Sequence, residues 1–210
     1  MHRPQISVER DLPGLARLPW SLRVDGISTV VRPSTARDLA DVAVMHHRCS
    51  PRTLLGRYQL GGRPPPILAM DRMLREPFSY VVARRGSGGG TGSVIATAML
   101  SADPNYGPNA VTAGVLVQDS WQRLGIGTEL MTHLAGVAAT CGHHELVAYP
   151  GLMSEAIHRL VTQVGTTRLI ETEEGTHLRT ALPPHATAGL GPLRTGVLDD
   201  GDEMFLRRSG

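Results

Sequence analysis

The chain of 210 residues lacks lysine altogether, and all 21 of its basic residues are arginine. Its two cysteines, Cys49 and Cys141, are too few for a disulfide framework. No apolar run reaches the roughly 18 residues that a membrane-spanning helix needs. The N-terminal segment also lacks the apolar stretch of a signal peptide. These absences favour a soluble protein with reduced thiols, so we expect a cytoplasmic location and no membrane partner.

The charge and length favour one globular domain. The net charge is +2 and the arginines are spread along the chain, so nucleic acid is not expected as a partner. Hydrophobic residues make up 41% and charged residues 19%, which is typical of a well-cored domain. We expect this domain at 26–182, after a loosely ordered leader at 1–25 and before a mobile glycine- and proline-rich tail at 183–210.

The hydrophobic periodicity predicts alternating strands and helices. Strand patterns occur at 27–32, 78–84, 93–101, 109–118, 145–149, 168–171 and 177–182. Helical patterns begin near Thr35, at Ser50 and at Ile67, and cover 125–140 and 153–163. A glycine-rich stretch at 86–92 precedes a strand rather than a helix, which predicts a hairpin loop and not a phosphate site. This order predicts an α/β (α+β) fold with a mixed, largely antiparallel sheet of six to seven strands.

The strongest functional signal is the entry into the helix at 125–140. An apolar strand ends at Gln118, and Gly125 and Gly127 open an amphipathic helix. The first turn of a helix has unpaired N–H groups and a partial positive charge, and glycines let a bulky anion approach them. The segment therefore suits a pyrophosphate. Leu130 replaces the third glycine of the nicotinamide fingerprint, and a P-loop would need a lysine.

Two motifs carry a resemblance to a known family. The spacing Gln122-x-x-Gly125-x-Gly127 resembles the Q/R-x-x-G-x-G/A signature of the GNAT superfamily of acetyl-CoA-dependent N-acetyltransferases. Residues 46–58 are similar to the H-x-R-x-S-P-x-T-L-x-x-R-F segment of the bacterial protein-lysine acetyltransferases within that superfamily. The resemblance covers roughly residues 27–182.

The resemblance implies a GNAT fold with a V-shaped split between two parallel strands, at 109–118 and 145–149. It implies acetyl-CoA as co-substrate, an amine as acceptor, no metal, and a monomer or homodimer. The Val117 N–H is expected to stabilise the oxyanion when the amine attacks the thioester directly. The residues implied in binding the cofactor are Leu116, Val117, Gln122, Arg123, Leu124, Gly125, Ile126, Gly127, Thr128 and Ser154.

The sequence departs from the family where protons are transferred. The lysine acetyltransferases carry a glutamate on the strand before the motif, and Thr112 stands at or close to that position. Many GNAT enzymes also use a tyrosine on the next helix as general acid, and Val161 stands there. Ser154 replaces the asparagine that often begins this helix. Threonine cannot act as a base near neutral pH, so a substitute or a water-mediated path is needed.

Several residues are candidates for this substitute, and the sequence leaves them open. An imidazole has a suitable pKa, although each histidine has an alternative interpretation as a surface or structural residue. Glu145 is a further candidate if it points into the split, and Tyr149 is a candidate general acid with strand packing as the alternative. The histidines are His46, His47, His143, His144 and His158.

Two functions of different classes follow. The first is an active N-acetyltransferase for a protein lysine, an N-terminus or a small amine. The second is an acyl-CoA-binding regulatory or sensor domain that has lost turnover, which the missing glutamate and tyrosine would explain. Because the chain contains no lysine, an active enzyme could not acetylate lysine side chains of its own.

Overall fold

The structure is a computed structural model that describes residues 6–8, 19–58, 61–85, 91–149, 154–172 and 175–183. A nine-stranded sheet forms its centre, in the order β1-β2-β3-β4-β5-β6-β7-β9-β8. Its strands are β1 (Ile6–Val8), β2 (Trp20–Val24), β3 (Ile27–Pro33), β4 (Phe78–Arg85), β5 (Thr91–Ser101), β6 (Ala110–Val117), β7 (Glu145–Ala148), β8 (Thr166–Thr172) and β9 (Gly175–Ala181).

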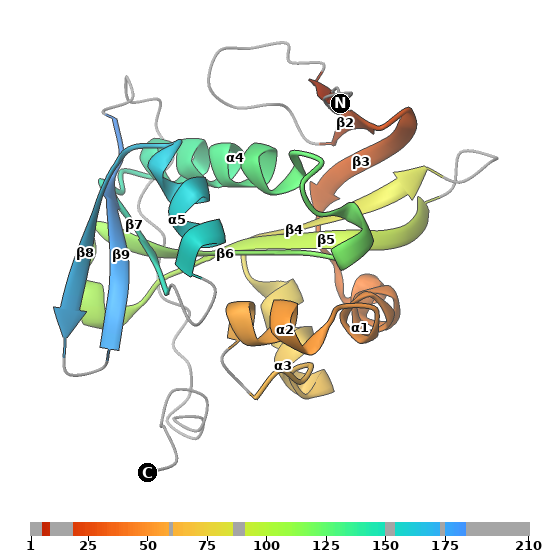
Figure 1. The fold of residues 1–210 in the computed structure, drawn as a ribbon, viewed down its shortest axis with the longest axis horizontal. Coiled ribbons are helices and arrows are strands. Elements are labelled where there is room, and N and C mark those ends of the chain that lie inside the picture. The colour runs from red at the N-terminus through yellow and green to blue at the C-terminus, as the bar shows by residue number, and fades with distance from the viewer. Residues whose placement is uncertain are drawn as a thin grey trace.

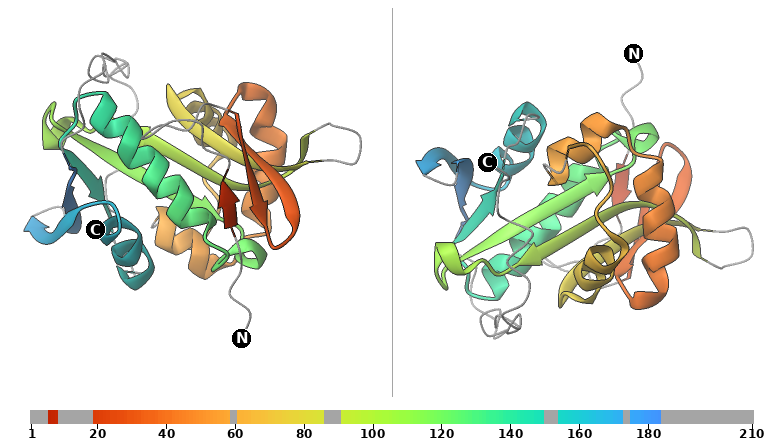
Figure 2. Two further views of the ribbon diagram at one scale, coloured as in Figure 1. Left: turned by 90° about the horizontal axis from the view of Figure 1, so that it is seen from above. Right: turned by 90° about the horizontal axis from the view of Figure 1, so that it is seen from below.

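Helices cover both faces of this sheet. Figure 1 shows α4 (Ile126–Thr140) and α5 (Ser154–Thr162) above it, and α1 (Leu39–His47), α2 (Pro51–Tyr58) and α3 (Ile67–Arg75) below it. The two views of Figure 2 show α4 running across one face and α1 to α3 gathered on the other. Among the described residues, no helix is both long and apolar enough to cross a membrane. The predicted fold class is confirmed.

The sheet has two more strands than predicted, both in the segment expected to be a leader. Trp20, Leu22 and Val24 alternate with more exposed neighbours and are 5%, 0% and 0% exposed. They pack in the main core, and β2 pairs antiparallel with β3. The leader prediction is therefore wrong for this strand, because three buried apolar side chains tie it to the domain. The predicted tail from residue 184 onward lies outside the described residues.

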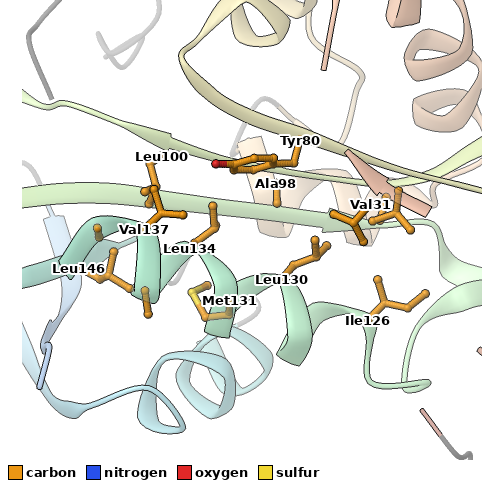
Figure 3. Close-up of a cluster of buried hydrophobic side chains, with 14 of the residues drawn as sticks. Val31, Tyr80, Ala98, Leu100, Ile126, Leu130, Met131, Leu134, Val137 and Leu146 are labelled. Carbon is orange, nitrogen blue, oxygen red and sulfur yellow. The ribbon is translucent and has the colours of Figure 1, made fainter. Parts of the chain in front are cut away.

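The core on the α4 face holds the start of α4 in place. Leu130, Met131 and Leu134 are fully buried against the sheet, as Figure 3 shows. Ile126, in the first turn, is also buried in this cluster. Burial of such side chains contributes about 1.5–3 kcal/mol each. The N-terminus of α4 is thus fixed relative to the sheet by apolar packing on both of its first two turns.

The predicted parallel pair of strands is confirmed and opens as a split. Strand β6 pairs with β7 only from Ala110 to Thr112, opposite Glu145 to Val147. Strand β6 then continues to Val117, while β7 pairs with β9 on its other side. Beyond Thr112, β6 therefore has a sheet neighbour, β5, on one side alone.

Gly165, just before β8, allows a close backbone crossing. A Cβ at this position would lie 2.0 Å from the Ala181 carbonyl oxygen. We expect Gly165→Ala to lower the free energy of unfolding by about 1–3 kcal/mol, because two backbone segments would have to separate. Urea unfolding measures the loss. Gly127→Ala is the control, since its Cβ would lie no closer than 3.5 Å to Leu160. Equal stability of both variants would contradict the expectation.

Candidate active site

The edge of β6 that faces the split carries unpaired backbone groups. The Gln118 N–H donates to the Ile95 carbonyl at 2.9 Å, and successive residues of a strand turn their backbone groups to opposite sides. Gln118 and Leu116 therefore point toward β5, while Val115 and Val117 point toward the split. Within the described ranges, no strand pairs with these two residues from that side. An extended chain with amide groups can pair with this edge as a strand would.

The N-terminus of α4 lies at the end of this edge and adds more free amides. Gly125 is the N-cap residue with φ of 85°, and Arg123 has φ of 61°. The first backbone bond of the helix runs from the Glu129 N–H to the Gly125 carbonyl at 3.1 Å. In the part of the chain that the structure describes, no backbone carbonyl accepts from the N–H groups of residues 125–128. These donors and the helix dipole suit an anion.

Gly127 lacks a side chain for a reason other than packing. A Cβ there would make ordinary contacts of 3.5 Å with Leu160 Cδ2 and 3.9 Å with Val117 Cγ2. Helix propensity would favour alanine over glycine by about 1 kcal/mol. Packing and propensity thus both permit a methyl group. A glycine here also leaves the helix backbone open to close approach by a ligand.

The Gln122 side chain supports the site from within. Its amide nitrogen donates to the Val117 carbonyl at 2.9 Å and to Thr53 Oγ1 at 3.0 Å. Both amide hydrogens are therefore used inside the protein. These bonds give the Gln122 amide group a positioning role, and contact of Gln122 with the cofactor stays a prediction. The Gln122 amide nitrogen donates to the Val117 carbonyl oxygen, so the Val117 N–H is the backbone group that faces the split without a partner from Gln122.

Asp119 joins the two sequence motifs. Its carboxylate accepts the Ser50 hydroxyl at 2.7 Å, the Ser50 N–H at 2.9 Å and the Thr53 hydroxyl at 3.0 Å. Burial raises the pKa of Asp119, but the hydrogen bonds from Ser50 and Thr53 outweigh it and lower that pKa. The segment that begins α2 is thereby fastened to the loop that enters α4.

The other predicted cofactor residues differ in what they can offer. Leu116 is a correction, because its side chain is buried and its backbone groups face β5. The Ile126 side chain lies in the core, so this residue offers its N–H alone. Arg123 is exposed, and Thr128 is half-buried in the first turn of α4. Ser154 is the first residue of α5.

Residues 52–165 match the model of the acetyltransferase (GNAT) family, which is more than half of the chain. The chain belongs to the GNAT acetyltransferase family. The GNAT domain of S. lividans PAT is similar in structure, with a TM-score of 0.63 and 22% identity over 77% of this chain and 96% of that one. No curated protein matches the sequence.

Two further solved structures have the same fold. A GNAT superfamily phosphinothricin acetyltransferase from Sinorhizobium meliloti, in complex with AcCoA, has a TM-score of 0.56 and 19% identity over 86% of this chain and 99% of that one. An acetyltransferase of the GNAT family from Streptococcus pneumoniae has a TM-score of 0.52 and 14% identity, over 73% and 98%. Together with the family match, they confirm the GNAT resemblance that the two motifs predicted.

Thr112 and Val161, the two residues that the resemblance places at proton-transfer positions, both have contacts inside the protein. The Thr112 hydroxyl donates to the Ser101 carbonyl at 2.8 Å. Val161 is fully buried in the main core. Neither side chain can exchange a proton near neutral pH.

Glu145 does not point into the split. It lies at the paired end of β7, opposite Ala110. Its carboxylate forms ion pairs with Arg168 at 3.0 Å and with Arg179. The prediction that it faces the cleft is corrected, because both oxygens are engaged at the closed end.

The histidine candidates are structural or exposed. His46 Nδ1–H donates to the Val42 carbonyl at 2.7 Å, and its Nε2 accepts the Tyr58 hydroxyl at 2.7 Å. Burial lowers the pKa of His46, as it does for His143. The side chain of His158 is exposed on α5. His47 and His144 are exposed as well.

The sequence interpretation missed a polar cluster beside the end of β7. The Tyr149 hydroxyl donates to Asp103 Oδ2 at 3.0 Å and accepts the Tyr106 hydroxyl at 3.0 Å. Tyr106 also contacts His177 Nδ1 at 3.3 Å. The sequence predicts Tyr149 as a candidate acid but does not predict its partners. These partners, Asp103 and Tyr106, lie in the loop between β5 and β6. No spacing rule connects that loop to β7.

Arg57 explains the glycine at position 114 of β6. A Cβ at Gly114 would lie 2.1 Å from the Arg57 Nη2, so the guanidinium rests directly on the strand. Arg57 also stacks over Tyr58, with 4.8 Å between Cζ and the ring centroid. Together with His46 and Ser79 it lines a pocket between the sheet and α1 to α3. This pocket lies on the face opposite α4.

Asp119→Asn tests the link between the motifs. Since the pKa of Asp119 is lowered in the folded protein, its stabilisation is complete above the ordinary value of 3.8 and is lost as pH falls through the lowered value. We expect the variant to lose about 1 kcal/mol at pH 7, a small loss because the carboxylate is exposed. Urea unfolding at pH 7 and pH 3 should show this difference at pH 7 and a smaller one at pH 3. A difference that stays constant would contradict the role of the charge.

Proposed function

We propose that this protein is an acetyl-CoA-dependent N-acetyltransferase that transfers the acetyl group to a primary amine. One observation carries the proposal: the free edge of β6 runs directly into the free amides of the α4 N-terminus. A ligand that lies along the edge at Val115 and Val117 and ends in a diphosphate at Gly125 and Gly127 has the chemistry of coenzyme A. Pantetheine supplies amides for the edge, and the pyrophosphate supplies negative charge for the helix.

The geometry supports direct transfer. With pantetheine along β6, the Val117 N–H faces the split and is free to donate to the thioester oxygen as negative charge develops there. The amine nitrogen forms the new N–C bond, the C–S bond breaks, and coenzyme A leaves as a thiolate that takes a proton. Residues on the face opposite α4 would meet the acceptor, which we propose is a protein lysine, an N-terminus or a small amine.

The second candidate is a regulatory domain that binds acyl-CoA without turnover. The Thr112 hydroxyl, committed to Ser101, and the buried Val161 favour it, since neither offers a proton-transfer group. Both functions require the same cofactor site. They differ only in the chemistry at the acceptor side.

Calorimetric titration with coenzyme A tests the cofactor site. Gly127→Glu places a carboxylate where the diphosphate would bind, so we expect at least a tenfold weaker affinity, about 1.4 kcal/mol. Thr132→Glu is the matched control, because it adds the same charge on an exposed position of the same helix. Wild-type protein without binding heat, or equal affinities of both variants, would contradict the proposal.

Release of the coenzyme A thiol measures turnover. The acceptors are N-α-acetyl-lysine amide, a peptide with a free N-terminus, spermidine and hydroxylamine, each with acetyl-CoA. The rate without protein is subtracted for each acceptor, because hydroxylamine attacks thioesters unaided. We expect acetylation of at least one, confirmed by the mass of the product. Tight binding of coenzyme A with no product from any acceptor would favour the regulatory domain over the enzyme.

A further inference from the structure

Tyr149 lies where β6 and β7 diverge, and its hydroxyl is bonded to a carboxylate. This residue follows β7 directly and is the second residue beyond Val147, the last one paired with β6. Alternation along the strand places Tyr149 on the same face as Val147 and Thr112. At about 3.3 Å per residue, it lies roughly 7 Å beyond the last pair, where the strands diverge. Its hydroxyl reaches the β5–β6 loop, where it is hydrogen-bonded to Asp103 and Tyr106.

The hydrogen bonds around Tyr149 have one direction. Asp103 Oδ2 can only accept, so Tyr149 donates to it, and Tyr149 in turn accepts from Tyr106. Because the Tyr106 hydroxyl hydrogen is donated to Tyr149, the Tyr106 oxygen accepts from His177 Nδ1–H. The Asn105 N–H holds the other oxygen of Asp103 at 3.0 Å. Each hydrogen bond in this series, from His177 through Tyr106 and Tyr149, donates in the direction of the Asp103 carboxylate.

Neighbouring residues hold this hydrogen-bonded series in place. His177 is 1% exposed. The Arg179 guanidinium lies over the Tyr106 ring at 5.8 Å and pairs with Glu145. Burial and the hydrogen bond from Tyr106 raise the pKa of Tyr149, so this phenol stays protonated at neutral pH. Such a group passes a proton on rather than storing one. Asp103 is the only carboxylate among the described residues to which Tyr149 is hydrogen-bonded.

We propose that Tyr149 accepts a proton from the acceptor ammonium while its own proton passes to Asp103. An N–H bond breaks as a new O–H bond forms on Tyr149, and the original O–H bond of Tyr149 breaks as one forms on Asp103. The amine lone pair is then free to attack the thioester. Asp103 later returns the proton to solvent. Tyr149 is the catalytic residue, and Tyr106 and His177 position it. The inference rests on the proposed acetyl transfer.

The test compares Tyr149→Phe and Asp103→Asn with wild-type protein, using the best ammonium-type acceptor of the panel and hydroxylamine. Hydroxylamine is uncharged at neutral pH and needs no prior deprotonation. With the ammonium-type acceptor we expect kcat to fall roughly 100-fold in both variants. With hydroxylamine we expect a change within about twofold, and the Kd for coenzyme A should stay unchanged, because neither residue lies at the cofactor site.

The pH profile gives a readout that a structural role would not move. In wild-type protein, kcat/KM for the ammonium-type acceptor should level off below the pKa of the free amine. In Tyr149→Phe it should rise until that pKa, because only amine already deprotonated in water reacts. The titratable and charged groups around the chain are Asp103, Tyr106, His177, Arg179 and Glu145. Tyr58→Phe is the control, since it removes a hydroxyl bonded to His46 instead.

Three results would overturn the inference. Unchanged kcat in Tyr149→Phe means that the proton leaves by another route. An equal loss with hydroxylamine and with the ammonium-type acceptor means that Tyr149 is structural. Absence of wild-type turnover with every acceptor contradicts the proposed enzyme and the relay with it, whereas wild-type turnover with unaffected variants contradicts the relay alone.

Discussion

The backbone of β6 beyond Thr112 loses its strand partner in the middle of a nine-stranded sheet, and the rest of the structure is arranged around that loss. Unpaired backbone groups inside a protein are costly unless water or a ligand satisfies them. The sheet tolerates the gap because β7 turns to β9 and α4 and α5 cover one face. The same gap gives an extended, amide-bearing ligand a place to complete the sheet.

The Asp119 and Gln122 side chains make this gap a fixed site. Gln122 donates a hydrogen bond to the Val117 carbonyl. Asp119 accepts hydrogen bonds from Ser50 and Thr53 at the start of α2. The loop that enters α4 is therefore fixed by three sets of contacts: with the sheet, with α2, and through the buried first turns of α4. Preorganised N–H donors need little rearrangement when an anion arrives. The proposed function therefore makes affinity for the cofactor and the geometry of the Val117 N–H depend on the same few side chains.

The sequence predicted what depends on local physics. The α4 pattern and its glycine entry were visible because apolar spacing and helix-end chemistry are local signals, whereas the parallel pair was implied by the family resemblance. Trp20 to Val24 was missed because a five-residue strand with mixed residues has a weak period. The inward role of Gln122 and the β5-facing backbone of Leu116 depend on strand register, which one sequence does not specify. Asp103 reaches Tyr149 only through the folded β5–β6 loop.

The central claim is that the free edge of β6 and the first turn of α4 bind coenzyme A together. Backbone amide exchange, followed residue by residue by NMR with and without coenzyme A, tests it most directly. The account predicts strong protection at Val115, Val117 and residues 125–128, with little change on the β5-facing amides of Gly114 and Leu116, which are already bonded. Protection confined to other segments, or none at these amides under saturating coenzyme A, would contradict it.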